Sequence, residues 1–146
     1  MTPPDPEAPT QPSLLRHILP VAVGGAVALL LTIVTDNTLG VHGLLPAAGQ
    51  TVPGTGALLL VAAYRGVFVM LGCHMAARLA PPGNPRIRYA LGLGGLILLM
   101  NVVATVSEWG RVPMWYSISG IALTVPYAII GGGTAARVMA RAQRGG

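Results

Sequence analysis

The segment that decides the fold runs from Tyr64 to Pro81 and reads YRGVFVMLGCHMAARLAP. It ends a longer apolar run, and Arg65 is the one arginine inside an apolar run of this length. A helix needs about 20 mostly apolar residues to cross the hydrocarbon core of a bilayer. The run therefore predicts a transmembrane helix over residues 56–80, which ends at the prolines because proline cannot continue a helix.

Three further apolar segments of similar length occur in the 146-residue chain, at about residues 14–35, 86–107 and 114–139. Only 9% of the residues are charged, whereas a soluble domain usually has about 25%. Such a chain has too little polar surface to cover a water-soluble globule. The sequence therefore predicts an all-α, polytopic membrane protein with a four-helix transmembrane domain over residues 14–139.

The segments outside the predicted spans differ in composition. Residues 1–13 contain five prolines and no apolar cluster, which is typical of a disordered tail. Residues 36–55 are punctuated by glycine, proline and asparagine, and they predict a loop whose apolar part, residues 41–48, dips into the interface. Residues 140–146 form a short basic tail.

The arginines are distributed unevenly between the two sides of such a four-span protein. One side has Arg111, and Arg65 lies within a span. The other side has the remaining seven, namely Arg16, Arg78, Arg86, Arg88, Arg137, Arg141 and Arg144. Because arginine-rich loops stay in the cytoplasm, both termini and both tails are predicted to be cytoplasmic.

A shortened copy of the second span's end returns near the C-terminus. Aligning Ala76 with Ala135, an offset of 59 residues, also aligns Gly72 with Gly131. Small residues one turn apart allow close packing of membrane helices. A weaker match of two glycine pairs links the first and third spans. The pattern indicates two parallel hairpins related by an axis along the membrane normal, or else a chance likeness of apolar sequences.

Arg65 is the main candidate for a functional residue. It shares a helix face with Gly72 and Ala76. A charge at membrane depth costs at least about 2.5–3.5 kcal/mol, so we expect it to pair with Asp36 or Glu108, at the outer ends of the first and third spans. The functional interpretation is an anion or headgroup contact, or a gate, in an outward-facing cavity. The structural interpretation is a charged clasp between helices, or snorkelling to the interface.

Four other polar residues are candidates for defined contacts. Asn101, deep in the third span, is expected to form an interhelical hydrogen bond, with a substrate ligand as the alternative. His74 and Arg78 are spaced i, i+4 near the predicted cytoplasmic interface, where Arg137 also lies, and this placement favours contact with lipid headgroups. Cys73 is the only cysteine and is expected to be a packing residue, with palmitoylation or redox sensing as alternatives.

The composition argues against several classes of function. The chain has no Ser/His/Asp set, no paired intramembrane carboxylates and no nucleotide-binding loop, so we expect no enzyme activity and no cofactor. Its three histidines are far apart in sequence and depth, so no metal site is expected. The arginines form no patch with interleaved aromatic residues, which argues against nucleic-acid binding.

The remaining interpretation is a small scaffold or accessory subunit that packs in a homo-oligomer or a larger membrane complex. Its partners would then be the lipid bilayer and other membrane helices. The alternative is a small transporter or channel, with an anion or lipid pathway that involves Arg65.

One sequence pattern resembles a known group of proteins. It consists of Tyr64-Arg65, Phe68, Gly72, Ala77-Arg78, Pro81 and Arg86. The pattern is similar to that of small bacterial four-span membrane proteins with no established activity, and the likeness covers about half of the chain. Cys73-His74 stands here where a glycine-aromatic pair is frequent in that group. The resemblance implies a multi-pass protein of the bacterial inner membrane and implies no chemistry.

Overall fold

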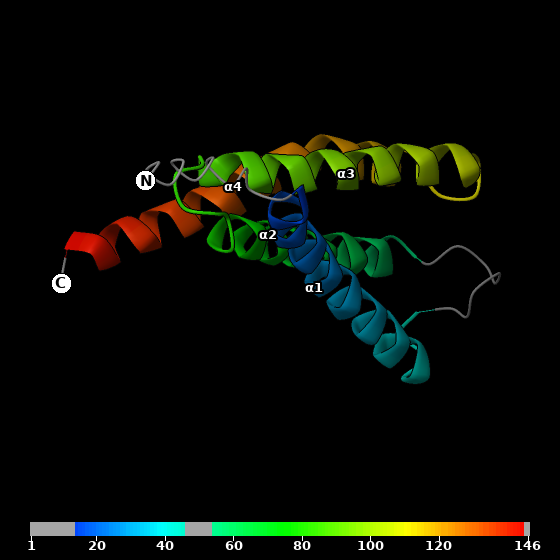
Figure 1. The fold of residues 1–146 in the computed structure, drawn as a ribbon. Coiled ribbons are helices and arrows are strands. Elements are labelled where there is room, and N and C mark those ends of the chain that lie inside the picture. Colours follow the sequence, from blue (N-terminus) through cyan, green and yellow to red (C-terminus); the bar gives the residue numbers. More distant parts are fainter. Residues whose placement is uncertain (1–13, 46–53, 145–146) are drawn as a thin grey trace, which may run out of the picture.

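The computed structural model describes residues 14–45 and 54–144 (Figure 1). This part of the chain forms four helices, α1 (Leu14–Val41), α2 (Thr55–Arg78), α3 (Arg86–Ser107) and α4 (Met114–Arg144). All four are long and apolar enough to span a membrane. The prediction of an all-α, four-helix membrane protein is confirmed. The predictions for residues 1–13 and for most of the first loop lie outside the described residues.

Helix α1 is longer than predicted. The sequence predicted a loop from residue 36, but the helix continues to Val41. The Thr38 hydroxyl donates a hydrogen bond of 2.8 Å to the Val34 carbonyl and so bonds within the helix. The chain leaves helical geometry near Gly43, which has a φ of 69° that favours glycine. The loop predicted from the glycine and asparagine residues of this segment therefore began about one and a half turns too early.

The other helix boundaries follow the predicted spans closely. Helix α3 begins at Arg86 and ends at Ser107, as expected. Helix α2 ends at Arg78, two residues before the predicted end. Helix α4 stays helical through Pro126 and extends to Arg144, five residues beyond its predicted end. Its last residues, Ala-Arg-Ala-Gln-Arg, are all good helix formers, which accounts for the extension.

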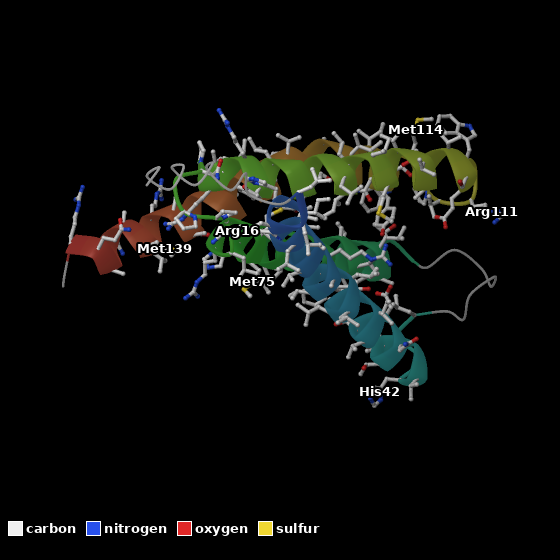
Figure 2. The ribbon with its side chains drawn as sticks, viewed as in Figure 1. Arg16, His42, Met75, Arg111, Met114 and Met139 are labelled. Atoms are coloured by element: carbon white, nitrogen blue, oxygen red, sulfur yellow. The ribbon has the colours of Figure 1, made fainter. Side chains whose placement is uncertain are left out.

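The helices run alternately up and down, so the two described chain ends lie at the same end of the bundle (Figure 1). We call this the arginine-rich end, because seven arginines lie there: Arg16, Arg78, Arg86, Arg88, Arg137, Arg141 and Arg144. Figure 2 shows Arg111 and His42 at the opposite end, far from Met139. The fold therefore separates the arginines as the four-span prediction requires.

Close contacts between small residues hold the helices together. At the crossing of α1 and α2, a Cβ atom added to Gly72 would lie 2.6 Å from the Gly24 carbonyl oxygen. Between α3 and α4, a Cβ on Gly94 would lie 2.5 Å from the Ala128 methyl group. Ala76 and Ala135 are completely buried. Glycine and alanine permit these distances because they have little or no side chain to separate the backbones.

The two hairpins do not pack as the repeat predicted. Gly72 faces α1, its hairpin partner, but its counterpart Gly131 faces α2, and the next residue, Gly132, faces α3. In the described helices, α2 contacts α3 whereas α1 does not contact α4. A two-fold axis along the membrane normal would make these two pairs equivalent. The expectation of such an axis is therefore wrong for the packing of this bundle.

Candidate functional site

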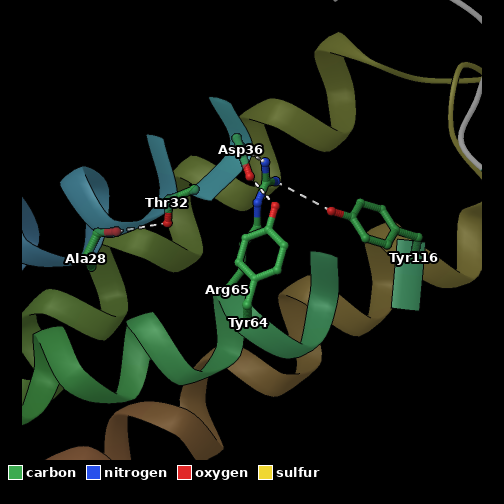
Figure 3. Close-up of polar contacts among 6 residues, drawn as sticks. All are labelled: Ala28, Thr32, Asp36, Tyr64, Arg65 and Tyr116. Atoms are coloured by element: carbon green, nitrogen blue, oxygen red, sulfur yellow. Dashed lines mark hydrogen bonds and ion pairs between the residues drawn. The ribbon is translucent and has the colours of Figure 1, made fainter. Parts of the chain in front are cut away.

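Four polar side chains from three helices meet near the end opposite the arginine-rich end (Figure 3). We call this group the Arg65 cluster, and it consists of Asp36 of α1, Tyr64 and Arg65 of α2, and Tyr116 of α4. Arg65 Nη2 donates a hydrogen bond of 2.7 Å to Asp36 Oδ2. The Tyr64 hydroxyl donates to the other carboxylate oxygen, Oδ1. The carboxylate is thus bound through both of its oxygens.

The extension of α1 places Asp36 in this cluster. Figure 1 shows α1 crossing α2 obliquely, so that the second half of α1 diverges from the bundle. Asp36 follows Thr32 by one turn, and the Thr32 hydroxyl is bonded to the Ala28 carbonyl at 2.8 Å. The long side chains of Tyr64 and Arg65 reach from α2 to the diverging helix (Figure 3). The cluster therefore joins α1 to α2 where the two helices diverge, and in this sense it is a tie between them.

Tyr116 connects the cluster to α4. Its hydroxyl lies 3.5 Å from Arg65 Nη1, which is at the long limit for a hydrogen bond. The neighbouring Trp115 packs edge-on against the Tyr116 ring, with centroids 6.0 Å apart. Tyr116 thus brings α4 into the cluster as its third helix.

The cluster is electrically balanced and partly open to its surroundings. The Arg65 side chain is 47% exposed and the Asp36 side chain is 33% exposed. This contact is the one ion pair among residues 14–45 and 54–144. Glu108, the other expected counter-charge, is exposed just after α3, and neither Arg65 nor any other basic group pairs with it within that part of the chain.

A second polar contact lies between α3 and α4. Asn101 Nδ2 donates to Thr124 Oγ1 at 3.0 Å and to the Gly120 carbonyl at 3.3 Å. Thr124 is only 2% exposed, and its hydroxyl donates to the same carbonyl at 2.6 Å. Asn101 thus forms the interhelical hydrogen bond that its position predicted. The repeat aligns Thr124 with Arg65, so one hairpin has an uncharged contact where the other has the ion pair.

The remaining predicted residues lie toward the arginine-rich end and do not join the Arg65 cluster. His74 Nδ1 lies 3.1 Å from Thr134 Oγ1, which links α2 and α4. Arg78 and Arg137 are exposed. Cys73 is free and completely buried, and it packs where Gly131 approaches α2. No group of three potential metal ligands occurs in the part of the chain that the structure describes.

Several aromatic residues make contacts that were not predicted from the sequence. The Tyr64 and Tyr116 hydroxyls join the Arg65 cluster. At the arginine-rich end, a 2.6 Å hydrogen bond joins His17 Nδ1 to the Tyr89 hydroxyl, and the two rings stack at 10°. The adjacency of Tyr64 to Arg65 was a usable signal. The His17–Tyr89 contact joins residues 72 positions apart and has no local signal in the sequence.

The comparisons with known proteins do not add a function to this geometry. No protein-family model, no curated protein and no solved structure matches the chain.

Proposed function

We propose that this chain is a non-enzymatic structural subunit of a membrane, which packs through its outer helix faces against further copies of itself. Its polar groups support this proposal because they bond to one another. The described helices contain no buried side-chain nitrogen or oxygen without a hydrogen-bond partner. The Arg65 cluster and the Asn101–Thr124 contact then act as ties that hold the helices in place.

The observation that most directly supports association is an open pair of glycines on α3. Gly92 and Gly95 lie on the face opposite the buried Leu93 and Gly94, and a Cβ at either would meet nothing within 4 Å. Within the bundle, Gly24, Gly72, Gly94, Gly131 and Gly132 all lie at close helix contacts. An open pair of the same kind, beside the 60% exposed Leu99, offers a second helix the same close approach.

Disulfide cross-linking in native membranes tests this association. In a Cys73→Ala background, Gly95→Cys places a thiol on the open face, and Ile129→Cys places one on a 52% exposed position of α4 as a control. We expect a cross-linked dimer at position 95 and none at position 129. Equal cross-linking at both positions, or none at position 95, would contradict the proposal.

We further propose that the arginine-rich end faces the cytoplasm and that the membrane is a bacterial inner membrane. The concentration of seven arginines at one end supports the orientation, by the positive-inside rule. The resemblance to small bacterial four-span proteins supports the choice of membrane.

The second candidate function is a transporter or channel with an anion or lipid pathway through Arg65. It is favoured by the exposure of the Arg65 side chain, which is 47%. A guanidinium has five N–H donors, and the contacts to Asp36 and Tyr116 occupy two of its nitrogens. Reconstituted vesicles distinguish the two functions. Loss of anion flux in a folded Arg65→Gln protein would favour transport. Loss of thermal stability alone would favour the structural role of the Arg65 cluster.

A further inference from the structure

A groove lies at the arginine-rich end, between the start of α1 and the end of α2. Its volume is about 350 Å³. Leu19 and Val23 line it from α1, and Leu79 and the Pro81-Pro82 pair line it from the end of α2 and the loop that follows. Arg16 is the one charged residue in the lining. The groove is therefore apolar along its length, with a cation at the edge of the membrane-spanning region.

The walls of this groove are held in place by the local backbone. Two adjacent prolines fix the chain after α2, and the Asn84 N–H closes a turn onto the Pro81 carbonyl at 3.3 Å. Gly83 completes that turn with a φ of 83°. On the other side, Pro20 is buried in the first turns of α1. A groove with such fixed walls loses little conformational entropy when a ligand occupies it.

The chemistry of the lining identifies one class of ligand. An apolar groove of this kind accommodates a hydrocarbon chain, and an exposed guanidinium binds phosphate through a fork of N–H donors. Arg16 is exposed and forms no ion pair within the described residues. Arg78, directly before Leu79, adds a second positive charge at the same end. We propose that this groove binds an anionic phospholipid, with one acyl chain along the apolar lining and the phosphate at Arg16.

A second groove provides an internal comparison. It lies between α2 and α4, has a volume of about 290 Å³, and includes Val67, Met70 and Ile130 in its lining. Its polar residues, His74 and Thr134, are hydrogen-bonded to each other, and no arginine or acidic side chain lines it. Lipid in this groove has no cation to distinguish one headgroup from another. Selectivity for anionic lipid is therefore specific to the groove at Arg16.

Native mass spectrometry of the delipidated protein tests the proposal, with phosphatidylglycerol and phosphatidylcholine as probes. We expect one phosphatidylglycerol per chain to bind more tightly than phosphatidylcholine. Arg16→Gln should weaken that binding by about fivefold, the effect of one basic residue near an anionic surface. Arg88→Gln removes the same charge from an exposed site outside the groove and should leave the affinity unchanged. Equal affinity for the two lipids, or equal effects of the two substitutions, would overturn the proposal.

Photo-cross-linking locates the lipid. Phosphatidylglycerol with a diazirine in its acyl chain should label peptides that contain Leu19, Val23 and Leu79. Labelling spread over all four helices in proportion to their exposed area would overturn the assignment. Deletion of residues 2–12 should not change the labelling. A severalfold rise after the deletion would assign the groove to the chain's own N-terminal segment instead. Lipid binding here and association through α3 involve different faces, so either can fail without the other.

Discussion

Arg65 of α2 and Asp36 of α1 form an ion pair of 2.7 Å at the point where the two helices have diverged. The two helices approach closely at their crossing, where Gly24 meets Gly72. The ion pair is therefore a second attachment point, which fixes the angle between α1 and the rest of the bundle. Tyr64 and Tyr116 extend this attachment to both carboxylate oxygens and to α4.

Loss of the ion pair should destabilise the bundle. Arg65→Gln and Asp36→Asn should each lower the free energy of unfolding by about 1–2 kcal/mol, because hydrogen bonds to charged groups contribute up to about 3 kcal/mol and partial exposure reduces that value. Thermal unfolding in detergent measures the change. The double variant should lose less than the sum of the single losses, since the two residues interact directly. Additive losses, or an equal loss in the control Arg111→Gln, would show that the pair does not stabilise the fold.

Substitution of a glycine at the helix crossing should be more disruptive than substitution of an open glycine. Gly72→Ala places a Cβ 2.6 Å from the Gly24 carbonyl oxygen, so the helices must move apart. Such overpacking costs about 1–3 kcal/mol. Gly133→Ala meets no atom within 4 Å and should stabilise α4 by up to about 1 kcal/mol. Unfolding in SDS–detergent mixtures measures the change in the free energy of unfolding for each variant. An equal change in the two variants would rule out close packing at Gly72.

The uncharged contact between α3 and α4 should contribute less than the ion pair. Asn101→Ala and Thr124→Val should each cost about 0.6 kcal/mol, the average measured for interhelical hydrogen bonds in membranes. A double-mutant cycle on thermal unfolding isolates the pairwise contribution. Ser107→Ala is the control, because among the described residues the Ser107 hydroxyl bonds to the Val103 carbonyl of its own helix alone. A coupling energy of zero would mean that the contact does not hold α3 to α4.

Orientation is measurable with an impermeant maleimide on intact bacterial spheroplasts. In a Cys73→Ala background, Gly110→Cys lies in the turn between α3 and α4, and Ala142→Cys lies in the last turn of α4. We expect position 110 to be labelled in intact cells and position 142 only after lysis. The reverse pattern would invert the proposed topology.

Local sequence signals predicted the helices well and their contacts only in part. The bounds of α3 follow from the arginine at its start and the polar residues after its end, because desolvation restricts charges to the interface. The prediction for α1 was wrong at Asp36, where a loop was expected to begin. The contacts of Asp36 with Tyr64 and Arg65 stabilise the helix at this position, because tertiary contacts override local propensity.

The choice of partners was less predictable than the helices. Asp36 and Glu108 were equivalent candidates by depth, and only the crossing of α1 over α2 brings Asp36 to Arg65. The repeat aligned Gly72 with Gly131, yet the two glycines face different neighbours. Sequence likeness reports which residues are small and where they lie along the helix. It does not report the rotation of one hairpin relative to the other.

The most direct test of the central proposal is native mass spectrometry of the protein released from nanodiscs that contain bacterial lipids. We expect a complex with a mass at least twice that of the 15.0 kDa chain. We also expect Gly95→Leu, which fills the open face of α3, to convert this complex to a monomer that is still folded. A wild-type protein that appears only as a 15.0 kDa monomer would show that the chain does not associate with further copies of itself.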